Sequence, residues 1–169
     1  MQHSFTAIDF ETAVGHHLCS VGIITVEKGE IVEEYHALIQ PPNNFYNWHN
    51  IQVHGITEDD TRHEPTFIDV YPEIKKRLEG RVVVAHNESF DRGVLTKSMA
   101  DIGLEYTELA LPKKWECTLR IYKDKGYKPA KLDACCSVHN IELKHHEALS
   151  DARACAKLFI LAKHTQLFI

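Results

Sequence analysis

The segment IDFETAV (residues 8–14) places two acidic side chains in what otherwise reads as a buried β-strand. Side chains two positions apart on a strand project from the same face, so Asp9 and Glu11 point together and Phe10 points away from them. Two carboxylates that lose hydration side by side repel each other, and this is costly unless a cation lies between them. The segment therefore indicates a central strand with a cation site near its carboxyl end, although two exposed acids at a strand end would give the same pattern.

Strand-like and helix-like segments follow one another along the 169-residue chain. We expect strands at 4–11 and 81–86, and two more strands within 18–41 that a tight turn at Lys28-Gly29 separates. We expect helices at 66–79, 88–103, 131–139 and 147–164. Strands that first pair in a hairpin and then alternate with helices predict an α/β fold, in which helices cover both faces of a sheet of mixed direction. The length fits a single domain spanning residues 1–169.

The formal net charge of −5 argues against a protein that coats nucleic acid indiscriminately, because such proteins usually carry an excess of basic residues. The segment from Lys113 to Lys131 is nevertheless locally basic, with seven basic and two acidic residues. It is either a solvated loop and helix face or a surface that faces phosphates.

The five cysteines are odd in number and lack a C-x-x-C spacing. We therefore expect buried, unpaired thiols, which fit a reducing cytoplasm. The longest apolar runs are too short to span a bilayer, and the N-terminal segment does not resemble a secretory signal. These features predict a cytoplasmic location with no membrane association.

The segment VVVAHNESFD (residues 82–91) runs from a buried strand directly into a helix and places Asp91 in the first helical turn. Carboxyl ends of strands in open α/β sheets are where ligands collect, and this strand is expected beside the one that bears Asp9 and Glu11. A purely structural interpretation also fits, because Asn87 is a good helix cap and an acid in the first turn gains from the helix dipole.

The segment HHEALSDARACAKLF (residues 145–159) contains an acid that does not fit the helix around it. Asp151 shares the apolar stripe of the helix with Cys155 and Leu158, and no basic residue lies one turn away on that stripe. A buried, unpaired aspartate would be strongly destabilising. Small side chains at fourfold spacing would let the helix lie close to the sheet and bring Asp151 near the strand carboxylates; they are Ala148, Ala152 and Ala156.

Together these motifs predict four converging carboxylates, from Asp9, Glu11, Asp91 and Asp151. Two divalent cations, Mg²⁺ or Mn²⁺, would balance their charge, and ligation by oxygen atoms alone argues against zinc. Two such ions can activate a water and stabilise the leaving oxygen of a phosphodiester. His146, near the start of the same helix, is the candidate general base, because an imidazole can accept a proton from water at neutral pH.

The three motifs resemble those of the DEDDh 3′–5′ exonucleases, the group that contains the proofreading epsilon subunit of bacterial DNA polymerase III and ribonuclease T. The residues that carry the resemblance are Asp9-Phe10-Glu11-Thr12, His86-Asn87-x-x-Phe90-Asp91 and His146-x-Ala148-x-x-Asp151. The resemblance implies a ribonuclease H-like fold with a five-stranded mixed sheet whose first three strands form an antiparallel meander. It also implies release of nucleoside 5′-monophosphates from a 3′ end, with the four acids as metal ligands and His146 as the base.

The resemblance further implies a pocket for the terminal nucleotide. The segment IQVHGIT resembles a family turn that lies against that nucleotide, which makes His54 and Thr12 candidates for binding it; the neighbouring candidates are Phe10, Asn87 and Phe90. The implied partner is a nucleic acid, DNA or RNA, with a free, single-stranded 3′ end, in a free-standing enzyme or in a polymerase or repair complex. Tyr106 and Trp115 could stack on a base or simply pack in the core.

Two other classes of function remain compatible with the sequence. An endonuclease or a transferase on the same fold would also use four acids, but it would not need a pocket for a chain end. A module that binds nucleic acid or a protein partner without catalysis would keep the fold after losing activity.

Overall fold

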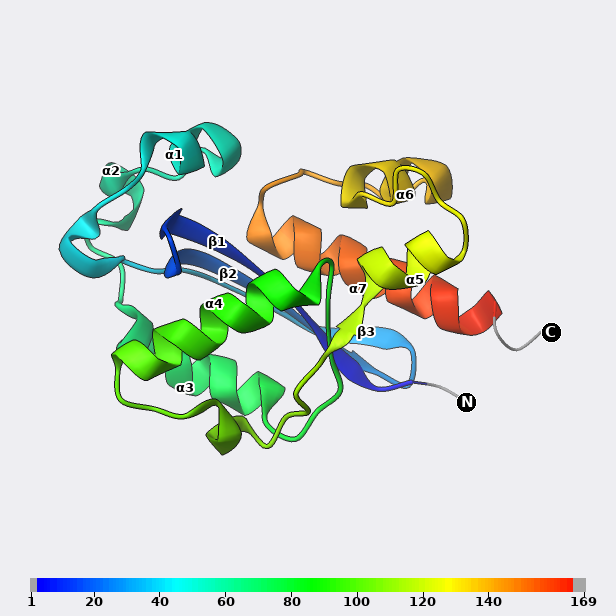
Figure 1. Cartoon of the computed structure of the whole chain (residues 1–169), viewed down its shortest axis with the longest axis horizontal. Coiled ribbons are helices and arrows are strands. Elements are labelled where there is room, and N and C mark those ends of the chain that lie inside the picture. The colour runs from blue at the N-terminus through cyan, green and yellow to red at the C-terminus, as the bar shows by residue number, and fades with distance from the viewer. Residues whose placement is uncertain (1–2, 166–169) are drawn as a thin grey trace.

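The computed structural model describes residues 3–165, which form a five-stranded sheet and helices on both of its faces (Figure 1). The strands are β1 (Phe5–Val14), β2 (His17–Glu27), β3 (Glu30–Leu38), β4 (Val83–Ala85) and β5 (Glu116–Cys117). The α-helices are α1 (Trp48–His54), α2 (Glu58–Thr61), α3 (Phe67–Leu78), α4 (Glu88–Asp101), α5 (Thr118–Asp124), α6 (Leu132–His139) and α7 (Ala148–Thr165). Short 3₁₀ turns cover η1 (Pro42–Asn44) and η2 (Tyr106–Leu109).

The sheet has the strand order β3-β2-β1-β4-β5, and β1 is its central strand. The first three strands form an antiparallel meander, whereas β4 and β5 run parallel to β1. A turn at Lys28-Gly29 joins β2 to β3 with both residues at positive φ, as tight hairpins require. The predicted α/β class, the mixed sheet and the helices on both faces are confirmed.

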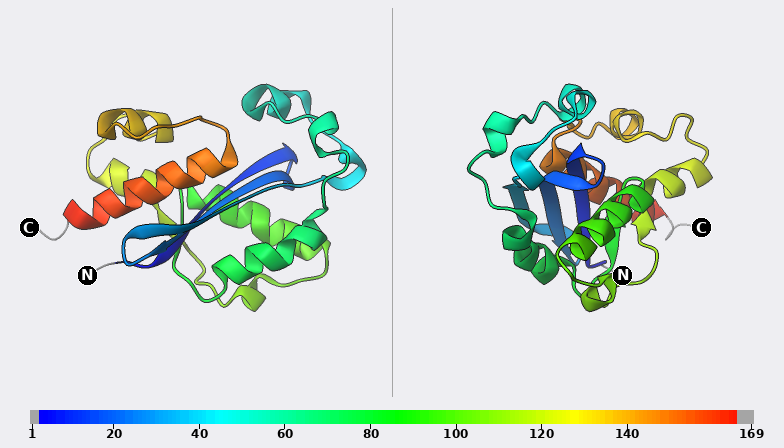
Figure 2. Two further views of the ribbon diagram at one scale, coloured as in Figure 1. Left: turned by 180° about the vertical axis from the view of Figure 1, so that it is seen from behind. Right: turned by 60° about the vertical axis from the view of Figure 1, so that its left-hand side comes forward.

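Alternate residues of β1 pack against different layers. Ile8 and Phe10 belong to the apolar cluster that includes residues of α3 and α4, whereas Phe5 and Ala7 belong to the cluster that includes residues of α7. Figure 2 shows these two layers on opposite sides of the strands. Because side chains alternate along a strand, the acids at positions 9 and 11 continue the row that faces α7.

The predicted helices and strands are confirmed to within a few residues at each end. The helices α1, α2 and α5 and the strand β5 are not evident from the sequence pattern. These elements have between two and seven residues, too few to show a clear hydrophobic period, and tertiary contacts determine whether such short elements form.

All five cysteines are buried and unpaired, as expected. Within residues 3–165, no helix combines the length and apolarity that crossing a membrane requires. The cytoplasmic location stays a prediction.

Candidate active site

Three carboxylates meet on one face of β1, two from the strand itself and one from the last helix. Ligand oxygens of Asp9, Glu11 and Asp151 lie within 4.8 Å of one another. The side chain of Asp151 points inward from the first turn of α7, and the residue is only 4% exposed. The acid on the apolar stripe of the last helix therefore faces the strand acids.

The fourth acid, Asp91, reaches the site from the opposite layer. It lies in the first turn of α4, it is buried, and its Oδ1 accepts a hydrogen bond of 3.0 Å from the backbone N–H of Phe10. This bond ties α4 to β1 between the two strand acids.

Close packing of α7 on β2 places Asp151 near the strand. Gly22 pairs with Asp9 in the sheet, and a Cβ at Gly22 would lie 2.3 Å from the carbonyl oxygen of Ala148. The predicted small side chains are also buried where α7 crosses the sheet; they are Ala148, Ala152 and Ala156. The backbone of α7 therefore approaches β2 at a point where only glycine fits.

The convergence of acids has a large electrostatic cost. Burial raises the pKa of the Asp9 carboxyl well above its usual range, and the charges of the other three acids raise this pKa further. Burial, together with Asp151 and Asp91, raises the pKa of Glu11 to about 8. Burial likewise raises the pKa of Asp91 to about 8, although the Phe10 N–H bond opposes this shift. Such a cluster favours either protons or bound cations at neutral pH.

The two oxygens of Asp151 have different environments. Oδ2 lies 2.9 Å from Nδ1 of His145 and accepts a bond of 3.1 Å from the backbone N–H of His146. Oδ1 is buried, and among the described residues it has no hydrogen-bond partner. An orphaned carboxylate oxygen beside two further carboxylates is what a divalent cation with oxygen ligands would satisfy. The donor set therefore fits Mg²⁺ or Mn²⁺.

His145 and His146 occupy different positions although they are adjacent. The ring of His145 pairs with Asp151 from the segment that precedes α7, so this partner lies outside the helix stripe, which itself offers no basic residue one turn away. His146 adopts a left-handed backbone conformation with φ +67°, and its ring stacks on that of His145 with centroids 3.9 Å apart. Burial lowers the pKa of His146, which keeps the imidazole neutral and able to accept a proton. Its ring nitrogens make no hydrogen bond within residues 3–165, so either nitrogen can accept a hydrogen bond from a water molecule.

A cavity of about 630 Å³ opens in front of the acids. Its wall includes Phe90, which is 46% exposed, and Lys131, which precedes α6. The remaining lining residues are Asp9, Phe10, Glu11, His86, Leu119, Leu132, Asp133, His145, His146 and Asp151. Of the basic segment 113–131, Lys131 lines this cavity, whereas Lys114 and Arg120 line a different one.

His54 lies beside the carboxyl end of β1, where both of its ring nitrogens have partners. Its Nδ1 accepts a hydrogen bond from the backbone N–H of Ile56, so Nε2 carries the proton and donates to the carbonyl of Thr12 at 3.1 Å. Asn50 donates to the same carbonyl and to the Thr12 hydroxyl. These bonds hold α1 against β1, and His54 is not among the residues that line the cavity in front of the acids.

Two further predicted substrate contacts, Phe10 and Asn87, and the neighbouring His86 lie in three different settings. Phe10 is 2% exposed and packs in the core, so its N–H bond to Asp91 is its polar contribution to the site. Asn87 is exposed with φ +73° and occupies the N-cap position of α4, but its side chain makes no capping hydrogen bond. His86 supports the junction of β4 and α4, because its Nδ1 lies 2.9 Å from the Thr118 hydroxyl.

The two aromatic residues considered for base stacking pack elsewhere. Trp115 is buried, and its Nε1 donates to the hydroxyl of Tyr106, which donates in turn to the carbonyl of Pro112. Core packing therefore accounts for both residues. Lys131, by contrast, is a site residue that the sequence analysis did not single out, because nothing in its local pattern separates it from the six other cations of its segment.

Comparisons with known proteins agree with this geometry. The family model RNase_T, described as an exonuclease, matches residues 6–159. The PolC-type DNA polymerase III of Thermotoga petrophila is 29% identical over 168 residues, which cover 93% of this chain and 12% of that protein. The 3′-5′ exonuclease DinG of Staphylococcus aureus is 32% identical over 171 residues, covering 94% of this chain and 18% of that protein. The chain thus spans less than a fifth of the length of these relatives.

Among solved structures, Exonuclease X in complex with 5′ overhanging duplex DNA matches with a TM-score of 0.74 and 26% identity, covering 97% of this chain and 93% of that one. The family match extends over most of the chain, and the acids of the three motifs lie together in the structure. The chain therefore belongs to the DEDDh family of 3′–5′ exonucleases.

Proposed function

We propose that this chain hydrolyses the terminal phosphodiester bond at the 3′ end of a single-stranded nucleic acid and releases a nucleoside 5′-monophosphate. The observation that carries the proposal is the group formed by buried Asp151 and the half-buried Asp9 and Glu11, which lines an open cavity and includes an unpartnered oxygen on Asp151. Such a group is unfavourable in a metal-free protein, and it has the ligand atoms that a phosphodiester hydrolase needs.

Four carboxylates would hold the metal: Asp9, Glu11, Asp91 and Asp151. Two Mg²⁺ or Mn²⁺ ions bound there would supply Lewis acidity for the attacking water and for the departing 3′ oxygen. The protein fixes the carboxylates by other means. The Phe10 N–H holds Asp91, and the His145 ring and the His146 N–H hold Asp151.

His146 is the proposed general base. Its ring lines the cavity and is stacked on a neighbouring imidazole that is itself bonded to Asp151. It would accept the proton of the attacking water as the water oxygen bonds to phosphorus and the bond to the 3′ oxygen breaks. His145 would act as a positioning residue, because its Nδ1 is engaged by Asp151.

The α1 side of the site is the proposed binding surface for the terminal nucleotides. Asn50 and His54 attach α1 to Thr12, one residue after Glu11. Trp48, on the same helix, is 71% exposed, and an exposed aromatic ring offers a face on which a base can stack. In the wall of the cavity, Phe90 and Lys131 would contact a base and a phosphate, respectively, and Asn87, at the start of the helix that carries Phe90, would extend this surface.

We propose the larger assembly in which this chain acts from the proteins that contain its counterparts. Its counterparts are segments of a PolC-type polymerase and of DinG, so association with a replication or repair complex is the context we favour. The structure with duplex DNA bearing a 5′ overhang favours DNA as the first substrate to test.

The test uses single-stranded DNA and RNA of one sequence, labelled at the 5′ end, with Mg²⁺ or Mn²⁺ and with chelator. We expect a descending ladder and nucleoside 5′-monophosphate as the product, no reaction with chelator, and no reaction for Asp151→Asn. A circular single strand, which has no 3′ end, should stay intact. Cutting of the circle would support an endonuclease instead, and inactivity on both polymers with both ions would support the noncatalytic alternative.

A further inference from the structure

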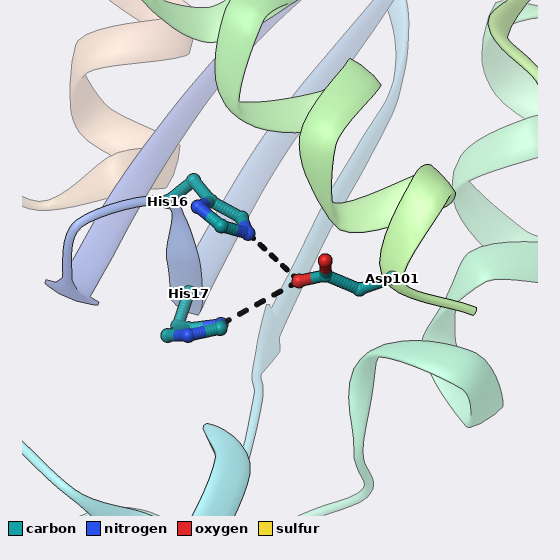
Figure 3. A group of neighbouring side chains, drawn as sticks. All are labelled: His16, His17 and Asp101. Carbon is teal, nitrogen blue, oxygen red and sulfur yellow. Dashed lines mark hydrogen bonds and ion pairs between the residues drawn. The ribbon is translucent and has the colours of Figure 1, made fainter. Parts of the chain in front are cut away.

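A second group of metal-ligating side chains lies at the turn between β1 and β2. Nε2 of His16 lies 2.7 Å from Oδ2 of Asp101, and Nδ1 of His17 lies 3.8 Å from the same oxygen (Figure 3). One ligand atom from each residue lies within 4.8 Å of the other two. The histidines are adjacent in the sequence, but Asp101 is the last residue of α4, so no local spacing could reveal the group.

The backbone around this group is fixed independently of the three side chains. Ser98 in α4 donates a hydrogen bond of 3.0 Å to the carbonyl of His16, and His17 pairs with Val14 at the start of β2. The two imidazole rings lie with their centroids 4.6 Å apart. The turn and the helix end are therefore held together before any ligand binds.

The observed distances are close to those of a coordination site. Zinc binds imidazole nitrogen and carboxylate oxygen at about 2.0 to 2.2 Å, so ligand atoms at tetrahedral angles are about 3.3 Å apart. The distances of 2.7 and 3.8 Å from the Asp101 oxygen lie on either side of this value. Small side-chain rotations would bring all three atoms to bonding distance.

The alternative is a simple ion pair between His16 and Asp101, which would not include His17. At 3.8 Å, Nδ1 of His17 is too far from the carboxylate for a hydrogen bond. Within the described part of the chain, the ion-pair partners of Asp101 are these two histidines, so no lysine or arginine competes for it. The side chains of His16, His17 and Asp101 are 30%, 34% and 50% exposed, which leaves the group accessible to an ion from solvent.

We propose that His16, His17 and Asp101 bind one first-row transition metal ion, of which Zn²⁺ is the representative, with water at the remaining position. Two imidazoles and one carboxylate suit such an ion, whereas the acid cluster of the active site suits Mg²⁺ or Mn²⁺. The ion would link the β1–β2 turn to the end of α4. The turn follows β1, which carries Asp9 and Glu11, and Asp91 lies in α4, so the link would stabilise the part of the fold that holds three of the four acids.

The test uses Co²⁺ as a spectroscopic substitute for Zn²⁺, in the full 169-residue chain with excess Mg²⁺ to occupy the acid cluster. We expect one equivalent of Co²⁺ to bind with visible absorption bands of a low-coordinate nitrogen and oxygen site, and to raise the unfolding temperature. His17→Gln and Asp101→Asn should each weaken binding at least tenfold and remove the bands. His63→Gln, at an exposed histidine elsewhere, is the matched control and should bind as the original chain does.

Asp151→Asn separates this site from the pair of histidines beside the active site. The bands should persist in Asp151→Asn, because the proposed ligands are untouched, and urea unfolding without metal should show that every variant folds. Bands that survive in both His17→Gln and Asp101→Asn, or that disappear in Asp151→Asn, would overturn the proposal. So would the absence of Co²⁺ binding by the original chain in excess Mg²⁺.

Discussion

The clearest test of the acid cluster is the stability of Glu11→Gln without metal. In the folded chain the pKa of Glu11 is raised from 4.5 to about 8, chiefly by burial and then by Asp151 and Asp91. A raised pKa means that the folded state holds a proton that the unfolded state has lost. The contribution of Glu11 to stability is therefore complete below pH 4.5, and it is lost as the pH rises towards 8.

The magnitude follows from the size of this shift. One pKa unit corresponds to about 1.4 kcal/mol, so full expression of the shift would lower the free energy of unfolding by about 5 kcal/mol at pH 8. Glu11 is partly exposed, and solvent screening reduces this effect, so we expect about 2 kcal/mol. Glutamine has nearly the same shape and no charge, and Glu11 makes no side-chain hydrogen bond within the described residues that the substitution would break.

The assay is urea unfolding with chelator at pH 5 and at pH 8. At pH 8, Glu11→Gln should be more stable than the original chain by about 2 kcal/mol, or about 4 to 8 °C in unfolding temperature, and the difference should nearly vanish at pH 5. With Mg²⁺ the original chain should become the more stable of the two, because its Glu11 carboxylate can bind the ion and the glutamine of the variant cannot. Glu30→Gln, at an exposed acid at the start of β3, is the control. A variant that is equally stable or less stable at pH 8 without metal would refute the reasoning.

Three further predictions test other parts of the site. Gly22→Ala should lower the free energy of unfolding by about 1 to 3 kcal/mol and activity by about 100-fold, because the added Cβ pushes α7 from the sheet. Gly93→Ala, with open space at its Cβ, should be nearly neutral, and equal effects of the two substitutions would contradict the packing account. His146→Ala should lower kcat by about 100-fold or more with saturating Mg²⁺ at pH 7.5, whereas His145→Ala should mainly weaken metal binding; a kcat unchanged in His146→Ala would remove it as the base. Trp48→Ala should weaken single-strand binding about tenfold in fluorescence anisotropy while Trp48→Phe retains most of the affinity, and unchanged binding in both would exclude stacking at α1.

The sequence predicted those parts of the site in which a residue conflicts with its own local pattern. Asp151 stands on an apolar helix stripe, and Asp9 and Glu11 stand in a buried strand, so each acid indicated a cation without knowledge of the fold. The partners of these acids could not be predicted in the same way. His145 reaches Asp151 because His146 adopts a positive φ, which is uncommon for a residue other than glycine and which no spacing rule anticipates.

The elements that the sequence did not reveal depend on tertiary bonds. The helix α1 has seven residues and no fully buried side chain. Its attachment to the sheet comes from Asn50 and His54, which donate to the Thr12 carbonyl, and from Ile51, which packs against the apolar cluster around Ala13 and Cys19. The strand β5 has two residues and is defined by its pairing with β4. The contact at Gly22 was also missed, because a glycine within a strand has several ordinary explanations and only the position of α7 selects one.

The alternation of side chains along β1 explains why this fold can tolerate its acids. Ile8 and Phe10 anchor β1 to the layer of α3 and α4, while Phe5 and Ala7 anchor it to α7 on the other face. Each helix is therefore held by apolar contacts that do not involve the carboxylates. Asp151 meets the strand acids directly because α7 covers the face on which they lie, whereas Asp91 comes from the other layer and reaches the strand at the Phe10 N–H. The apolar contacts on the two faces of β1 thus act against the repulsion among the carboxylates. Neutralising a single acid should therefore stabilise the metal-free fold without detaching α4 or α7 from the sheet.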